Sequence, residues 1–193
     1  LTQDYPGPAQ ILFGGATEQD PAAAVVRDLL QRHPATDAEL VHCPERLGAN
    51  AKVSSLVQLA RQARHELVLI SDGDVAAPPD LLRHLLAPMA DPGVGLAHCF
   101  YRMIVPGAGQ RPAVNTPTHW EAVGVNIDFW SQVLQSKSLW PLDFALGAAM
   151  ATSRRWLAQM VGLEALADYL ADDFQLGHRI AQAGGRVECC RVV

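Results

Sequence analysis

Long hydrophobic runs are absent from this 193-residue sequence, because Arg, Asp, Pro or Gly interrupts each of its longer apolar stretches. A transmembrane helix needs roughly 20 mostly apolar residues, so the sequence predicts neither a membrane span nor a signal peptide. Leu1 stands where an initiator Met is usual, and the last residues resemble a strand. We therefore expect this chain to be a piece of a longer protein whose membrane segments lie elsewhere.

Clustered basic residues and paired cysteines are also lacking. The sequence has 15 Lys and Arg against 20 Asp and Glu, for a formal net charge of −5, and no block of five like charges. Because clustered Lys and Arg bind a phosphate backbone, we do not expect a nucleic-acid partner. The four cysteines show no Cys-x-x-Cys spacing, which favours buried free thiols in a reducing compartment.

The chain does contain enough apolar material for a single domain, since hydrophobic residues make up 49% and charged residues 18%. Short apolar runs alternate with amphipathic segments, which indicates parallel βαβ units. We expect strands at 10–13, 39–42, 67–71, 94–100 and 186–192, and helices at 20–33, 49–63, 79–86, 118–135, 153–160 and 172–183. The predicted fold class is therefore α/β, a mostly parallel central sheet flanked by helices, with Asp20 and Ser153 as N-caps.

The segment Ser71-Asp72-Gly73-Asp74 follows the apolar run 67–70 directly. In an open α/β sheet, ligands bind at the carboxyl ends of the strands. Alternate residues of an extended chain point the same way, so Asp72 and Asp74 are placed to share one hard cation and the phosphate oxygens that it carries. A solvated turn is the competing interpretation, because Asp and Gly are common after any strand.

Three further clusters carry candidate chemistry. Gly48-Ala49-Asn50-Ala51-Lys52 lies at a predicted helix start, which suits a diphosphate but also an ordinary helix entrance with an exposed lysine. Asp172 and Asp173 begin another predicted helix, where the macrodipole alone favours acids, although a carboxylate held there also makes a good general base. Glu18 and Asp20 follow the first strand within reach of a nucleotide, and for Asp20 we favour the capping role.

In this order, the clusters resemble the ceramide glucosyltransferase-like family of GT-A fold glycosyltransferases, which includes bacterial hopanoid-associated glycosyltransferases. The resemblance runs from about residue 4 to the end of the chain. It is carried by the stretches Gly48-Ala49-Asn50-Ala51-Lys52, Leu69-Ile70-Ser71-Asp72-Gly73-Asp74-Val75, Phe144-Ala145-Leu146-Gly147-Ala148-Ala149-Met150 and Tyr169-Leu170-Ala171-Asp172-Asp173-Phe174.

The resemblance implies a role for each matching residue. Lys52 would lie near the nucleotide and Asp72 would contact the ribose or diphosphate of a UDP-sugar. Asp74, with Asp72, would ligate Mg²⁺ or Mn²⁺. Asp173 would be the general base, with Asp172 in the place of the family's usual Glu. His98 matches a family histidine near the active site, and a core histidine is an equal alternative.

Two departures from the family pattern stand out. The family places an aspartate, thought to hold the uracil, where this sequence has Thr17, which leaves Glu18 as the nearest acid. The Gln/Arg-x-x-Arg-Trp motif that follows the family's last strand is missing, and Ser153-Arg154-Arg155-Trp156 occurs too early to replace it. We expect Trp156 to pack in the core, and a chain without the motif to bind nucleotide poorly.

The resemblance implies an inverting transfer of glucose or N-acetylglucosamine from a UDP-sugar to a lipid hydroxyl, by a membrane-associated protein whose catalytic domain faces the cytoplasm. Residues 1–193 would form one catalytic domain, with a nucleotide-binding half at about 1–100 and an acceptor-side half at about 101–193. A soluble saccharide acceptor and an inactive nucleotide-sugar-binding module are the alternatives. A phosphotransferase ranks last, because Ala76 offers no hydroxyl.

The acceptor side is expected in the second half of the chain, which holds an aromatic group and a proline-rich loop. For the aromatic group we favour core packing over lipid binding; its members are Trp120, Phe129, Trp130 and Trp140. The loop at 106–117 is expected to act as a mobile lid.

Overall fold

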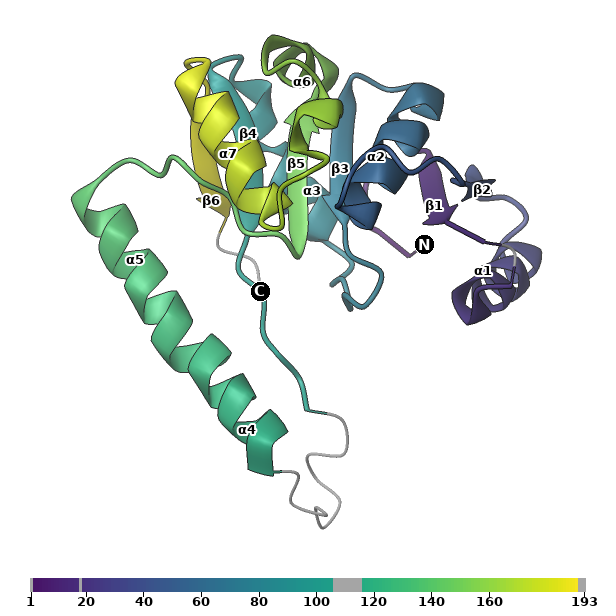
Figure 1. Ribbon diagram of the computed structural model, residues 1–193, viewed down its shortest axis with the longest axis horizontal. Helices are drawn as coiled ribbons and strands as arrows, with labels where there is room; N and C mark the ends of the chain where they lie inside the picture. The colour runs from purple at the N-terminus through teal and green to yellow at the C-terminus, as the bar shows by residue number, and fades with distance from the viewer. Residues whose placement is uncertain (1, 18, 106–115, 191–193) are drawn as a thin grey trace.

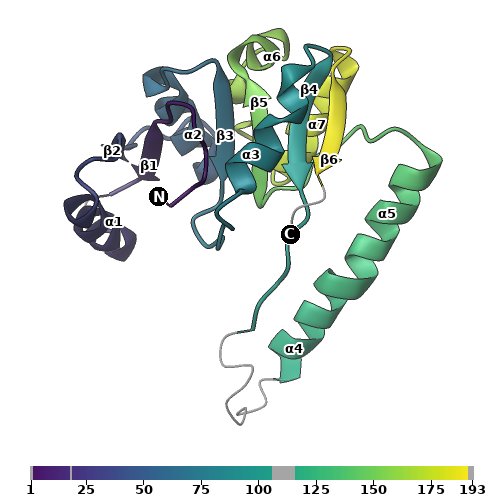
Figure 2. The ribbon, with the colours of Figure 1, turned by 180° about the vertical axis from the view of Figure 1, so that it is seen from behind.

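A computed structural model describes residues 2–17, 19–105 and 116–190. The chain forms a layered α/β body from which one long helical rod projects (Figure 1). The view from behind shows the same rod standing clear of the body (Figure 2). Within the described residues, no helix combines the length and apolar character that crossing a membrane requires.

Two sheets make up the strands of the body. The first pairs β1 (Ile11–Gly15) in parallel with β2 (Ala38–His42). The second has the order β3-β5-β4-β6, formed by Leu67–Ser71, Ala149–Ser153, Val94–Cys99 and Arg186–Cys190. The predicted strands are confirmed to within two residues at each end, although residues 191 and 192 of the last one lie outside the described residues. β5 is an additional strand, which the sequence analysis did not predict.

The expectation of a mostly parallel sheet is confirmed only in part. Among the described strands, β1–β2 and β4–β6 are parallel, whereas β3–β5 and β5–β4 are antiparallel. The reason is that β5 enters between β3 and β4 in the opposite direction, so that Met150 pairs with both Ile70 and His98. All five residues of β5 are buried, which gives this strand the centre of the sheet.

Helices cover both faces of the larger sheet. On one face lie α2 (Ala51–Gln62), α6 (Arg154–Gln159) and α7 (Asp172–Gln182), whose buried side chains join the main core. On the other face α3 (Leu81–Leu86) packs Leu81 and Leu85 against Ala97 and Ala151. Figures 1 and 2 show these two layers from opposite sides. Trp156 belongs to the main core, as predicted.

Capping residues fix where the helices begin. The Asp20 carboxylate accepts a hydrogen bond from the Ala22 backbone N at 2.9 Å and starts α1 (Pro21–Arg32). The Ser153 hydroxyl accepts one from Trp156 N at 3.3 Å. Both predicted N-caps are therefore confirmed. The short 3-10 turns η1 (Pro88–Ala90) and η3 (Leu163–Leu166) connect α3 to β4 and α6 to α7.

The cysteines match the expectation of free thiols. All four are unpaired, and three of them are buried; these are Cys43, Cys99 and Cys189. Burial is the largest cause that raises the pKa of the Cys99 and Cys189 thiols, each to about 11. Such thiols are protonated at neutral pH and are poor nucleophiles.

The projecting rod is one continuous helical run made of α4 (Thr116–Val123), the π-helix η2 (Gly124–Phe129) and α5 (Trp130–Leu139). Trp130 is buried against Phe100 and Tyr101, with ring centroids 4.6 and 5.1 Å apart. Trp120 and Trp140, in contrast, are 70% and 71% exposed. The core interpretation is thus confirmed for Trp130 and wrong for Trp120 and Trp140. These two side chains point into solvent, because the rod projects from the body and no other described element covers them.

Candidate active site

The carboxyl end of β3 presents the predicted pair of aspartates. Asp72 is half-buried, and its backbone N donates to the Ala148 carbonyl at 3.2 Å, which ties the end of β3 to the residue before β5. Asp74 is exposed two residues further on and makes no hydrogen bond or ion pair within the described parts of the chain. The turn between them therefore leaves one acid engaged with the protein and the other free to bind.

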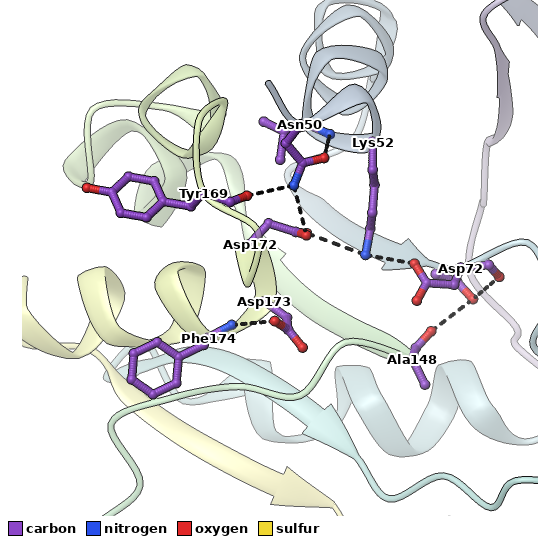
Figure 3. Close-up of polar contacts among 10 residues, drawn as sticks. Asn50, Lys52, Asp72, Ala148, Tyr169, Asp172, Asp173 and Phe174 are labelled. Atoms are coloured by element: carbon purple, nitrogen blue, oxygen red, sulfur yellow. Dashed lines mark hydrogen bonds and ion pairs between the residues drawn. The ribbon is translucent and has the colours of Figure 1, made fainter. Parts of the chain in front are cut away.

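Lys52 joins two of the predicted acids. Its Nζ lies 2.7 Å from Asp72 Oδ1 and 3.4 Å from Asp172 Oδ2 (Figure 3). Burial lowers the pKa of Lys52, but the hydrogen bond to Asp72 and the charges of Asp172 and Asp72 outweigh it and hold the pKa above its ordinary value. The lysine is therefore charged at neutral pH and links β3 to α7 through α2.

Asn50 holds the start of α2 against the start of α7. Its Oδ1 accepts from Val53 N at 3.1 Å, which caps α2. Its Nδ2 donates to the Tyr169 carbonyl at 2.8 Å and to Asp172 Oδ1 at 3.2 Å (Figure 3). Asp172 is 8% exposed, so this buried carboxylate is satisfied by Asn50 and Lys52 together.

Asp173, the expected general base, follows in the first turn of α7. Its Oδ1 accepts from Phe174 N at 2.7 Å. Its other oxygen lies so close to Gly147 that a Cβ built there would be 2.8 Å from Oδ2. Figure 3 shows the Asp173 side chain in the same region as Asp72, between the start of α7 and Ala148. The structure thus brings Lys52, Asp72, Asp172 and Asp173 together.

Close backbone contact sets the position of α7. A Cβ on Gly177 would lie 2.3 Å from the Ala145 backbone N, so only glycine permits α7 to approach this segment so closely. Phe174, one residue after the expected base, stacks on Phe144 with a centroid distance of 5.8 Å. The segment before β5 therefore packs directly against the first two turns of α7.

Tyr101 is a member of this site that sequence reasoning missed. It lies two residues beyond the last residue of β4, at the carboxyl end of a strand, and that position was the signal that could have identified it. Burial raises the pKa of its phenol, and the negative charges of Asp173 and Asp72 raise it further. Tyr101 therefore lies near both acids, and its backbone carbonyl accepts from Trp130 Nε1 at 2.8 Å.

His98 is not brought to the site. It lies within β4, fully buried, and neither ring nitrogen has a hydrogen-bond partner among the described residues. Burial, as the largest cause, and the positive charge of Lys137 together lower its pKa to about 4. The imidazole is therefore neutral at ordinary pH, which agrees with the core alternative for this residue.

The remaining predictions concern Glu18, the loop at 106–117, Thr17 and Asp20. Glu18 is outside the described residues, as is most of the expected lid at 106–117. Thr17 is exposed, and its carbonyl accepts from Asp20 N at 3.4 Å, within the turn that leads into α1. Asp20 itself serves as the helix cap.

The acids suit a divalent cation that also takes substrate oxygens. Within the described parts of the chain, no group of three or more His, Cys, Asp or Glu side chains is arranged to hold a metal ion. Mg²⁺ commonly binds through one or two carboxylates together with substrate phosphates, so Asp72 and Asp74 are a sufficient protein contribution. The free Asp74 carboxylate fits this donor set, whereas Asp72 would share its charge with Lys52.

A separate apolar pocket lies between β1, α2 and β3. Its walls are mostly aliphatic; they include Leu12, Leu56, Leu59, Leu67 and Leu69. None of the clustered acids lines this pocket, and we assign it no part in the chemistry.

The chain is similar to known proteins along its whole length. The family model for "Glycosyl transferase family 21" matches residues 1–193. "Ceramide glucosyltransferase 1" of Caenorhabditis elegans is 39% identical over 71 residues, which cover 37% of this chain and 15% of that protein. "Ceramide glucosyltransferase 3" of the same organism is 21% identical over 178 residues, which cover 91% of this chain and 37% of that protein.

The chain thus spans about a third of the length of a curated relative that it matches along most of its own length. The family match includes every part of the site described above, from the start of α2 to the first turn of α7. Family membership implies the GT-A fold for the layered body. On this full-length match, the chain belongs to glycosyl transferase family 21, the ceramide glucosyltransferase-like glycosyltransferases.

Proposed function

We propose that this chain is the catalytic domain of an inverting glycosyltransferase that moves a hexose, glucose or N-acetylglucosamine, from a UDP-sugar to a lipid hydroxyl. The observation that supports this proposal most strongly is that Asp72, Lys52 and Asp173 come together from three separate elements. Tyr101 lies close enough for the charges of both acids to raise the pKa of its phenol. Sugar transfer requires a general base beside the acceptor hydroxyl, and positive charge beside the leaving diphosphate.

Asp173 is proposed as the general base. The acceptor hydroxyl oxygen forms a bond to the anomeric carbon while the bond from that carbon to the diphosphate oxygen breaks, which inverts the configuration and releases UDP. The acceptor proton passes to Asp173. Because Phe174 N donates to Oδ1 of this carboxylate, the base is held in one orientation and Oδ2 remains for the proton.

The leaving diphosphate needs positive charge. Lys52 is charged, half-buried and already oriented by two carboxylates, so it can contact diphosphate oxygens with little reorganisation. Asp72 and Asp74 would hold Mg²⁺ or Mn²⁺, which supplies further charge neutralisation to the diphosphate when bound. The site would then place positive charge beside the leaving diphosphate, and the negative Asp173 carboxylate beside the acceptor hydroxyl that loses its proton.

A lipid acceptor is supported by the apolar face of the rod. Trp120 and Ile127 are 70% and 63% exposed, and Val123 and Leu134 are also exposed. Their spacing of three, four and seven residues places them along one side of the helical run. Soluble proteins rarely expose such a row, and Trp favours the membrane interface.

We therefore propose that the protein works at a membrane, with this domain on the cytoplasmic side. The rod packs through Trp130 on the segment that carries Tyr101, so a lipid gathered along it would lie beside the acids. The free thiols agree with a reducing compartment.

The experiment that tests the function is a transfer assay with the full-length protein in liposomes. Radiolabelled UDP-glucose and UDP-N-acetylglucosamine are offered with ceramide, diacylglycerol or a hopanoid as acceptor, with and without Mg²⁺ or Mn²⁺. Labelled glycolipid with one donor would support the proposal. Transfer only to soluble saccharides would contradict the lipid acceptor, and loss of label as free sugar without any glycolipid would contradict it too.

Calorimetry separates an enzyme from a binding module. UDP with Mn²⁺ should bind the native protein more tightly than Asp74→Ala or Lys52→Met. The first variant removes a proposed ligand of the cation, and the second removes a proposed charged contact to the diphosphate. Asp128→Ala, on the rod, is the matched control for Asp74→Ala. Binding without any turnover in the liposome assay would instead favour the inactive nucleotide-sugar-binding module.

A further inference from the structure

We propose that Asn50 is a positioning residue for the reaction, and that Asp172 is its partner rather than a second catalytic acid. This inference rests on the proposed function, because it concerns how Asp173 is held in place. The side chain of Asn50 caps one helix and at the same time fastens the first turn of the helix that carries the base.

The oxygen and the nitrogen of the Asn50 side-chain amide bind different parts of the protein. The oxygen accepts from Val53 N and so starts α2. The nitrogen donates to both Tyr169 O and Asp172 Oδ1. A serine or aspartate in this position would also cap α2, but neither side chain offers a donor to replace the amide nitrogen with the same reach. The second function is therefore specific to asparagine.

The backbone beside Asn50 strengthens the same contact. Asn50 N donates to the Ala167 carbonyl at 2.7 Å, and Ala49 N donates to Asp168 Oδ1 at 2.9 Å. A Cβ on Gly48 would lie 2.5 Å from Ala167 O, so glycine is what lets the two segments approach. The start of α2 and the segment before α7 thus form one joint.

The first turn of α7 depends on this joint. The N-cap residue of α7 is Ala171, whose side chain makes no capping hydrogen bond, so the usual side-chain cap is missing at the start of this helix. Asp172 supplies the anchor, because Oδ1 accepts from Asn50 and Oδ2 faces Lys52. Both oxygens of this buried carboxylate are occupied, which leaves Asp173 as the carboxylate free to take a proton.

Substitutions of Asn50 and Asp172 test the proposal in the full-length protein. Asn50→Asp keeps the cap but places a carboxylate against Asp172. We expect kcat to fall about 10- to 100-fold, since a displacement of about 1 Å at a reacting group costs that much. The KM for the UDP-sugar and the Kd for UDP should stay within about twofold of the native values. The melting temperature should fall, because two carboxylates would then face each other at the buried Asp172 and the Tyr169 carbonyl would lose its donor.

The double variant Asn50→Asp/Asp172→Asn is the decisive control. It restores a hydrogen bond across the joint with donor and acceptor exchanged, so it should recover at least part of the kcat lost in Asn50→Asp. The acidic limb of the pH profile of kcat should stay in place in both, because Asp173 is still the base, and should disappear in Asp173→Asn. Asn50→Ser, which caps without adding charge, should show an intermediate loss.

Several results would overturn the proposal. A rise in the Kd for UDP that equals the loss of kcat in Asn50→Asp would make Asn50 a nucleotide ligand. A double variant no better than Asn50→Asp would show that residues 50 and 172 are not coupled. Failure of the proposed function would look different: the native protein would form no glycolipid, while the coupling between residues 50 and 172 would still appear in a double-mutant cycle of unfolding midpoints.

Discussion

The joint between α2 and α7 and the rod formed by α4, η2 and α5 are attached to the body in opposite ways. At the joint, backbone hydrogen bonds, a shared amide and a lysine between two carboxylates connect α2, α7 and β3. The rod is tied by hydrogen bonds that include two between Asn126 and Met103, at 2.8 and 3.0 Å, one from Trp130 Nε1 to Tyr101 O at 2.8 Å and one from Lys137 Nζ to Cys189 O at 3.1 Å. The packing of Trp130 adds to them.

This difference indicates that the joint and the rod have different roles. Where polar groups must keep fixed distances, the joint supplies several hydrogen bonds, and the burial of Asp172 makes their displacement costly. The rod exposes aliphatic and aromatic side chains to solvent and, in the described part of the chain, is held by single side chains spread along its length, so it can adjust to a large apolar partner. In the proposed function, this contrast corresponds to a fixed donor side and an adaptable acceptor side.

The largest effect is expected where the joint meets the chemistry. Asp173→Asn should lower turnover by about 10²–10⁴, the usual loss when a positioned general base is removed. Binding of UDP should stay within about twofold. Stopped assays of glycolipid formation and calorimetry with UDP measure the two effects separately.

Asp128→Asn makes the same chemical change on the exposed side of the rod and should leave turnover unchanged. If Asp173→Asn weakened binding and turnover in parallel, Asp173 would belong to the nucleotide site rather than to the acceptor side.

The second effect concerns the place where the rod meets the body. His98 lies in β4 with a pKa of about 4, below its usual 6.5, and Lys137 from α5 is the nearby positive charge. Between these two pH values the unfolded chain binds the proton more readily than the folded one, so stability falls as the pH falls from 6.5 to 4. The lowered pKa corresponds to a loss of about 3 kcal/mol across that window.

His98→Leu should remove this part of the acid sensitivity. Urea unfolding at a series of pH values from 7 to 4 measures the slope in both proteins. Equal slopes in the native protein and His98→Leu would show that the buried imidazole is not responsible.

A third test removes the apolar face of the rod. The combined variant Trp120→Gln, Ile127→Asn and Leu134→Gln should raise the acceptor KM in liposomes about tenfold, because burial of each large apolar side chain contributes about 1.5–3 kcal/mol when complete. Exposed positions contribute little to folding, so the free energy of unfolding should change by less than about 0.5 kcal/mol per substitution.

Gln132→Ala with Gln135→Ala provides the matched control on exposed polar positions of the same rod. The adaptable acceptor side would be rejected if the apolar variant kept native transfer to embedded lipid, or if it lost UDP binding as well.

The smallest effect should be local. Asn126→Ala removes both hydrogen bonds to Met103 and should make opening of the rod easier by about 1–2 kcal/mol. Hydrogen exchange should quicken across 118–139 and stay unchanged in α2 and α7. Exchange that quickened equally in all helices would show that the rod and the body unfold together.

Local chemistry made part of this structure predictable. The caps of α1 and α6, the aspartates after β3 and the acids that begin α7 all depend on neighbours within a few residues, and each was correctly placed from sequence. The family resemblance was likewise confirmed by the match to the whole chain.

Long-range contacts account for what the sequence did not reveal. The direction of β5 depends on pairing with strands about 50 and 80 residues earlier, and no periodicity within β5 encodes it. Asn50 reads as a helix cap until Asp172, far along the chain, is brought beside it. The exposure of Trp120 and Trp140 could not be anticipated either, because apolar residues at helical spacing predict a core unless the partner face is missing.

Gly177 and Gly147 are two points of close contact between α7 and the segment before β5. Where α7 crosses the segment before β5, main chain contacts main chain at Gly177, and the Asp173 carboxylate contacts Gly147. Together with the joint to α2, these two contacts set the distance of Asp173 from the sheet. A methyl group added at either glycine would act as a spacer, and would displace the carboxylate that we propose as the proton acceptor.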